Sequence, residues 1–172
     1  MFKKRFLLII LALILALGLC ACGDSNVADS AEPYKPIKAD IEGLAAELLE
    51  GVAFEDELFR IDDEMISLYY EIPEGGKGVF YYGSGATAEE IAVFELADGN
   101  QADEFLIVAQ EHIADQILSY EDYIPEEVVR LEQAVVECHG KYVVVCVAAD
   151  TKTAEHIIDQ HILNTSGVGD AE

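Results

Sequence analysis

The clearest chemical signal in the sequence is a cysteine near its start. The run Phe6–Cys22 carries no charge and follows the basic residues Lys3–Arg5, which is the layout of an export signal. Ala21 supplies the small side chain that a lipoprotein signal needs before the modified cysteine, Cys22. We therefore expect a lipobox, cleavage before Cys22 and a diacylglyceryl group on its thiol, the lipobox residues being Leu19, Cys20 and Ala21.

Two other interpretations of this leader stay open. The uncharged run is close to the shortest length that spans a bilayer, so it could be a plain transmembrane anchor. It could also be an ordinary signal peptide without a lipid. The lipoprotein interpretation predicts that the protein is held on the outer face of the cytoplasmic membrane. Durable anchoring then needs two or more acyl chains, because one chain binds a membrane only marginally.

The charge of the chain excludes several partners. The sequence has ten basic and 34 acidic residues, and removal of the leader takes away three bases and no acid, which leaves a formal charge of −27. Such a surface repels nucleic acid phosphates and anionic head groups, so we expect no nucleic-acid binding. The acidic clusters Glu55–Glu57, Asp62–Glu64 and Glu126–Glu127 lack the ligand pattern of an EF-hand, and whether they bind Ca²⁺ stays open.

The residues that could catalyse a reaction form no recognisable set. Ser84 lies between glycines but lacks the G-x-S-x-G frame of a hydrolase nucleophile. Cys138 and His139 are neighbours whose side chains point apart, and His156 and His161 are spaced too far around a helix to share a metal. No pair of carboxylates stands out among 34 acids. We therefore predict no catalytic residue, no metal and no cofactor.

Tyrosines and cysteines of the later sequence suggest other roles. The cysteines expected to remain in the mature domain, Cys138 and Cys146, flank a predicted hairpin with the turn His139–Gly140. In that register Cys138 is opposite Lys141 and Cys146 is opposite Gln133 on the other face, so we expect two unpaired, mostly buried thiols.

Adjacent strand residues point to opposite faces, so one tyrosine of each adjacent pair is predicted to join an exposed binding surface. The candidates are Tyr69, Tyr70, Tyr81 and Tyr82.

The spacing of apolar residues gives the elements that must position these side chains. Helical periodicity predicts a helix from Ile41 to about Val52, a long helix capped by Asn100, a brief helix begun by Pro125 and a last helix capped by Thr151 or Asp150. A short helix is also expected after Asp62, although Ile66–Ile72 fits a strand as well. Strands are predicted over Gly78–Tyr82 and Glu90–Leu96 and in the hairpin around Gly140.

These elements predict an α+β domain with a four-stranded, mainly antiparallel sheet and helices packed on it. The predicted organisation is a signal peptide over residues 1–21, a lipidated cysteine and flexible spacer over 22–36, a single compact domain over 37–165 and a flexible tail over 166–172.

Several segments of the body resemble a known family. These segments are Glu89–Val93, the long helix leading to Tyr123–Glu127, and Leu131–Val136 followed by Gly140–Val144. They are similar to the Gram-positive lipoproteins grouped as domain of unknown function four-three-five-eight, over about Phe54 to Asp159. The resemblance implies one compact domain on a lipid tether, with no activity, cofactor or substrate to carry over.

Together these features favour a membrane-anchored extracytoplasmic lipoprotein. We expect its domain to be a non-catalytic module that binds an unknown protein or envelope component. The alternative is a small cell-envelope hydrolase whose acidic catalytic residues the sequence does not single out.

Overall fold

The computed structural model describes residues 37–167. The predicted signal peptide, the lipobox residues Leu19, Cys20 and Ala21, the modified residue Cys22 and the spacer to residue 36 lie outside the described residues. So do residues 168–172 of the predicted tail, whereas residues 166 and 167 belong to the last helix. Within residues 37–167, no helix has both the length and the apolar character needed to cross a membrane.

A five-stranded antiparallel sheet forms the centre of the domain, in the order β1-β2-β3-β5-β4. The sequences of the central strands β3 and β5 are nearly continuous apolar runs, because both faces of these strands are buried. The strands are β1 (Phe59–Arg60), β2 (Lys77–Tyr82), β3 (Glu90–Glu95), β4 (Val135–His139) and β5 (Tyr142–Val147).

The α+β class is therefore confirmed, but the prediction of four strands was wrong. The additional strand, β1, has only two residues, and it pairs Phe59 with Tyr82 and Arg60 with Tyr81. Two residues are too few for an alternating pattern, so only their pairing with β2 makes them a strand.

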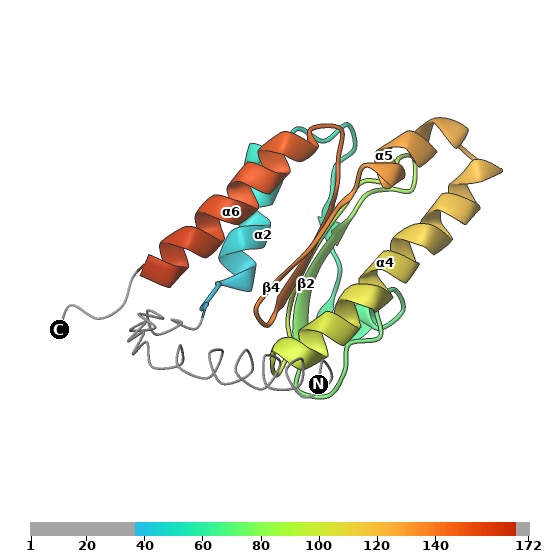
Figure 1. The fold of residues 1–172 in the computed structure, drawn as a ribbon. Helices are drawn as coiled ribbons and strands as arrows, with labels where there is room; N and C mark the ends of the chain where they lie inside the picture. The colour runs from blue at the N-terminus through green and yellow to red at the C-terminus, as the bar shows by residue number, and fades with distance from the viewer. Residues whose placement is uncertain (1–36, 168–172) are drawn as a thin grey trace, which may run out of the picture. The chain divides into compact units, whose positions relative to one another are not determined.

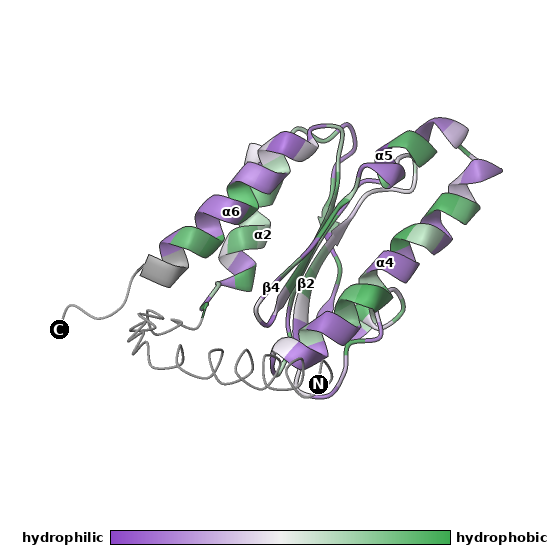
Figure 2. Cartoon of the chain, in the orientation of Figure 1, coloured by the Kyte–Doolittle hydropathy of each residue, from purple (hydrophilic) through white to green (hydrophobic). Residues whose placement is uncertain are grey.

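Helices cover both faces of the sheet and make three layers (Figure 1). The first helical layer consists of α2 (Ile41–Gly51) and α6 (Thr151–Gly167). The other face is covered by α3 (Asp63–Ile66), α4 (Gly99–Glu121), the 3₁₀ turn η1 (Pro125–Glu127) and α5 (Val128–Glu132). Hydrophilic and hydrophobic residues alternate along α4 and α6, as expected for helices with one buried side (Figure 2).

The two faces of the sheet bury different side chains. The α2 and α6 face is mainly aliphatic, with Leu44, Leu48 and Ile158 fully buried. The α4 face is rich in aromatic residues, among them Tyr70, Phe80, Phe94 and Phe105. Alternation along each strand assigns neighbouring residues to opposite cores.

The long helix begins two residues before the position predicted from the sequence. Asp98 precedes α4 and its carboxylate accepts a hydrogen bond of 2.9 Å from the backbone N–H of Gln101. Asn100, the predicted cap, is already inside the helix. Asp and Asn are comparable N-caps, so sequence preference alone does not separate them. At α6, Asp150 accepts from the backbone N–H of Thr153 at 3.1 Å, as one of the two predicted caps.

The C-terminal hairpin is present, but its predicted register was wrong. His139 pairs with Tyr142 and Cys138 with Val143, so the turn is Gly140–Lys141 and not His139–Gly140. Gly140 has a φ of 63°, a conformation that favours glycine, and it occupies the first turn position rather than the second. The partner of each residue moves by two positions, which leaves every side chain on its predicted face.

Candidate functional site

Two adjacent glutamates are buried where β3 begins. Glu89 is fully buried and Glu90 is 1% exposed. A buried carboxylate costs several kcal/mol unless the folded chain supplies donors or an opposite charge. These two side chains therefore require partners, and they find them in different parts of the domain.

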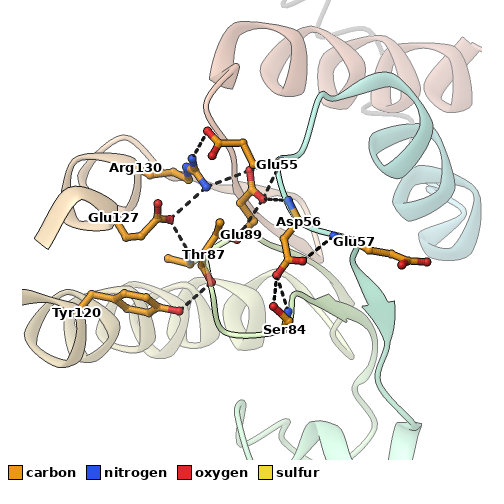
Figure 3. Close-up of polar contacts among 10 residues, drawn as sticks. Glu55, Asp56, Glu57, Ser84, Thr87, Glu89, Tyr120, Glu127 and Arg130 are labelled. Atoms are coloured by element: carbon orange, nitrogen blue, oxygen red, sulfur yellow. Dashed lines mark hydrogen bonds and ion pairs between the residues drawn. The ribbon is translucent and has the colours of Figure 1, made fainter. Parts of the chain in front are cut away.

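Glu89 connects three segments that are distant in sequence (Figure 3). Its carboxylate accepts hydrogen bonds from the backbone N–H groups of Glu55 at 3.0 Å and Asp56 at 2.9 Å. The Thr87 hydroxyl donates to it at 3.1 Å, and an Arg130 guanidinium nitrogen lies 3.1 Å from it. The carboxylate thus holds the loop after α2, the start of β3 and helix α5 together.

Arg130 extends this network to two more carboxylates. Its guanidinium lies 3.1 Å from Glu127 and 2.6 Å from Glu55, and its side chain is 9% exposed. Glu127 also accepts from the backbone N–H of Ala88 at 2.8 Å. One guanidinium therefore faces three carboxylates, Glu55, Glu89 and Glu127, of which only Glu55 lies mainly in solvent. We call these four residues the Arg130 network.

Two further contacts fix the loop between β2 and β3 beside the network (Figure 3). Asp56 accepts hydrogen bonds from the Ser84 hydroxyl at 2.6 Å and from its backbone N–H at 2.7 Å, and these bonds lower the pKa of Asp56. Tyr120 of α4 donates to the carbonyl of Thr87 at 2.8 Å. Ser84, the only glycine-flanked serine, therefore serves to hold this loop.

Glu90 is bound on the opposite face, among aromatic rings. The Tyr70 hydroxyl donates to it at 2.6 Å, and Nε2 of His112 lies 3.1 Å from its other oxygen. The rings of Tyr70 and His112 are 4.3 Å apart between centroids. Burial, followed by the charge of Glu90, raises the pKa of Tyr70 well above its ordinary value, so the phenol stays protonated as the donor.

Both groups of polar residues act within the domain. Their oxygens accept from backbone N–H groups, a threonine, a tyrosine, a histidine and an arginine of the same chain. Nucleophilic or acid–base chemistry requires such a group within reach of a substrate, in a concave site. The arrangement is suited to holding loops and helices in place.

The aromatic side chains at the same end of the sheet reach the surface. Phe59 is paired with Tyr82 across β1 and β2, and the Tyr82 ring is 5.7 Å from that of Tyr69. Burial raises the pKa of Tyr120, and hydrogen bonding with Tyr82 raises it further. The ring centroid of Tyr120 lies 6.5 Å from that of Tyr123. Phe59 is 53% and Tyr123 74% exposed, Tyr69 and Tyr82 are half-buried, and Tyr120 between them is buried. These five residues form what we call the aromatic row.

The four tyrosines predicted as a binding surface are not brought together on one face. Tyr70 is fully buried against Glu90, and Tyr81 packs on the α2 and α6 core. Tyr69 and Tyr82 pack on the other face and belong to the aromatic row. Alternation along β2 separates Tyr81 from Tyr82, while the turn after α3 directs Tyr70 inward.

The cysteines of the described domain are unpaired, as the hairpin predicted. Cys146 is buried in the aliphatic core and Cys138 packs against the aromatic core, so the sheet separates them. Burial raises the pKa of Cys146 to about 12, with further contributions from Glu90 and Glu89. Burial also raises the pKa of Cys138, so both thiols are poor nucleophiles at neutral pH.

The histidines considered as metal ligands lie apart from one another. His161 of α6 is 3.1 Å from Glu47 of α2, whereas His156 lines an open groove of about 510 Å³ between the same helices. The other lining residues of this groove are Glu47, Glu50, Gly51, Ile157 and Gln160. Among residues 37–167, no three or more His, Cys, Asp or Glu side chains are arranged to hold a metal ion.

The sequence reasoning missed Glu89, Glu90, Arg130 and the partner of His112. One signal was available: two acids directly precede the apolar run of β3, and acids that enter a core need partners. The identity of most of those partners was not available, because all except Thr87 lie 20 to 41 positions away along the chain, beyond the reach of any periodic pattern.

Comparisons with known proteins identify a family and no individual relative. No curated protein matches the chain, and no solved structure matches it. The model of one family, a domain of unknown function designated DUF4358, matches residues 52–148. This range contains the Arg130 network, Glu90 and its partners, and the aromatic row. The chain is therefore a member of the family defined by domain of unknown function DUF4358.

Proposed function

We propose that the protein is an exported lipoprotein, anchored by a diacylglyceryl group on Cys22 to the outer face of the cytoplasmic membrane. Its domain is a non-catalytic module that binds a protein or another component of the cell envelope. The basic start, the uncharged run to Cys22 and the small residue Ala21 support the anchor.

The observation that carries the binding role is the contrast between buried polar groups and exposed aromatic groups. The polar residues at the start of β3 are bound to partners within the domain. The aromatic row beside them presents Phe59 and Tyr123 to solvent. Exposed aromatic side chains offer a large contact area at a low entropy cost, and they are enriched among residues that dominate binding energy.

The binding role is tested by isolating the protein from membranes with whatever it holds. Wild type and the variants Phe59→Ala and Leu163→Ala would be purified from crosslinked membranes. Both side chains are exposed, but Phe59 lies on strand β1 and Leu163 on helix α6. We expect the same partner with wild type and Leu163→Ala, and its loss with Phe59→Ala. Recovery of no specific partner with wild type would contradict the binding role.

The anchor is tested separately by mass spectrometry of the mature protein. We expect a chain that begins at an acylated Cys22, and release from the membrane fraction in Cys22→Ala. Retention of Met1 or an unacylated first cysteine would contradict the anchor.

A small cell-envelope hydrolase is the second candidate, and the groove between α2 and α6 is the observation that favours it. The groove brings Glu47, Glu50 and His156 to one surface, which are residue types used in acid–base catalysis. Turnover of chromogenic ester, phosphate or glycoside substrates that disappears in Glu50→Gln would establish this candidate and remove the non-catalytic module. Equal rates in wild type and Glu50→Gln would exclude Glu50 as a catalytic residue.

A further inference from the structure

We infer that the aromatic row is the docking surface for a basic polypeptide segment, whose arginine or lysine side chains lie over the rings. This inference rests on the proposed binding role and adds the chemistry of the partner. It follows from the exposure of the rings, from the contacts that hold them and from the charges around them.

The rings are held in place before any partner arrives. Tyr69 contacts the buried ring of Phe80 with a centroid distance of 5.0 Å, and Tyr82 contacts the same ring at 5.8 Å. Strand pairing with Tyr82 fixes the backbone of Phe59 and places its side chain on the same face of the sheet as the Tyr82 ring. A surface that is ordered in the free protein loses less entropy on binding than a flexible one, which favours affinity.

The exposure of Phe59 and its neighbours exceeds what packing within the domain requires. Phe59 is 53%, Met65 46% and Leu68 74% exposed, all within one short segment that follows the loop of the Arg130 network. Scattered exposed apolar residues are ordinary, whereas several in one segment next to ordered aromatic rings are typical of an interaction surface.

Acidic side chains surround both exposed ends of the row. The segments 55–64 and 121–127, which contain Phe59 and Tyr123, hold ten acids and one base, Arg60. The guanidinium of Arg60 is bound to Glu42 and Asp63. Eight of the acids are exposed, namely Glu55, Glu57, Asp62, Asp63, Glu64, Glu121, Asp122 and Glu126.

This combination selects a cationic partner. An arginine or lysine over the face of a tyrosine or phenylalanine gains a cation–π interaction, and the surrounding carboxylates attract the same charge. The formal charge of −24 for the whole chain adds long-range steering in the same direction. A neutral polysaccharide would use the rings alone, and anionic polymers would be repelled.

The test uses the full chain in detergent micelles and a short fluorescent peptide in which arginine alternates with leucine. A peptide in which glutamate replaces every arginine is the matched probe with equal apolar content. We expect fluorescence anisotropy to show binding of the arginine peptide only. The binding is expected to weaken as salt rises from about 50 to about 500 mM, because ions screen the attraction.

Variants locate the binding on the molecule. Phe59→Ala and Tyr123→Ala remove exposed rings, and each is expected to weaken the binding of the arginine peptide about tenfold or more. Leu163→Ala removes a side chain of similar exposure, 63%, from α6 on the other layer and is expected to bind as wild type does. Circular dichroism of each variant confirms that the domain is folded.

The results separate this inference from the binding role itself. An arginine peptide that fails to bind, binds independently of salt, or binds equally to Phe59→Ala and wild type would overturn the inference. A membrane partner that is lost in Phe59→Ala but is a neutral polysaccharide would overturn it as well, while the binding role would stand. Absence of any membrane partner for wild type would remove the binding role.

Discussion

The two ends of β3 hold glutamates in opposite circumstances. At the first end, Glu89 and Glu90 are buried. Their hydrogen-bond partners come from the loop after α2, the turn after α3, and helices α4 and α5. At the other end, Glu95 pairs with Lys77 at 2.8 Å and with Lys141, and its side chain is 19% exposed. Buried carboxylates depend on the folded chain for every donor, whereas Glu95 shares its two lysines with water. The first end therefore holds the tertiary structure together, and the second adds little.

The largest effect is expected from Glu89→Ala. The substitution removes the acceptor of two backbone N–H groups and leaves Arg130 facing one fewer buried carboxylate. Breaking a buried ion pair from one side costs about 3–5 kcal/mol of unfolding free energy. Urea denaturation followed by circular dichroism measures the loss. Glu126→Ala, an exposed acid beside Glu127, is the control and should change the stability by less than about 0.5 kcal/mol.

Equal stability of Glu89→Ala and Glu126→Ala would show that the buried carboxylate of Glu89 does not stabilise the fold. The single variants Glu89→Ala and Arg130→Ala and the double variant together measure the coupling free energy between the two sites. A coupling free energy above zero shows that the ion pair, and not the loop alone, carries the effect.

An intermediate effect is expected from Tyr70→Phe. The phenol donates to Glu90 at 2.6 Å, and its removal leaves a buried carboxylate oxygen without that donor. The cost of an unsatisfied buried acceptor is about 1–3 kcal/mol. Thermal and urea unfolding measure it, with Tyr69→Phe as the half-buried control that keeps its ring contacts. A loss no greater than that of Tyr69→Phe would show that Glu90 does not depend on this donor.

The smallest effect is expected from Glu95→Gln, and it should appear as pH dependence. In the folded protein, hydrogen bonds from Lys141 and Lys77 lower the pKa of Glu95 below its ordinary value. A carboxyl group whose pKa is lowered by folding stabilises the protein at pH values above its ordinary pKa. This contribution to the stability is lost as the pH falls through the lower pKa of the folded state. Because water screens both pairs, the loss at neutral pH should be less than about 1 kcal/mol.

Urea unfolding of wild type and Glu95→Gln between about pH 7 and pH 3 checks this expectation. The difference between the two proteins should shrink as the solution becomes acidic. A difference that grows in acid would mean that Glu95 does not contribute as a carboxylate.

Glu89 and Glu90 also differ from each other, although they are adjacent. Glu89 faces a guanidinium and backbone N–H groups, and Glu90 faces a phenol and an imidazole among aromatic rings. Their side chains point to opposite sides of the chain, and each side is packed by different elements. Neighbouring acids of one type therefore tie together different parts of the fold.

Much of the architecture could be predicted from local pattern. Ile41, Leu44 and Leu48 at helical spacing gave α2, and the valines flanking Gly140 gave the hairpin. The prediction was wrong where the signal is short or shared by two residues. β1 is a strand only through its pairing, the cap of α4 is Asp98 rather than Asn100, and the glycine of the hairpin occupies the first turn position.

The amino-acid order alone was sufficient for the α+β class, the family resemblance, the acidic character and the separation of Cys138 from Cys146. Each of these depends on composition or on side-chain periodicity within a single element, which acts over a few residues. The export signal and the lipid on Cys22 are predictions of the same local kind. The Arg130 network, the pairing of Glu90 with Tyr70 and His112, and the division of the tyrosines between two cores depended on folding. They require contacts between residues far apart along the chain, and such contacts exist only once the sheet has placed its neighbouring strands and helices.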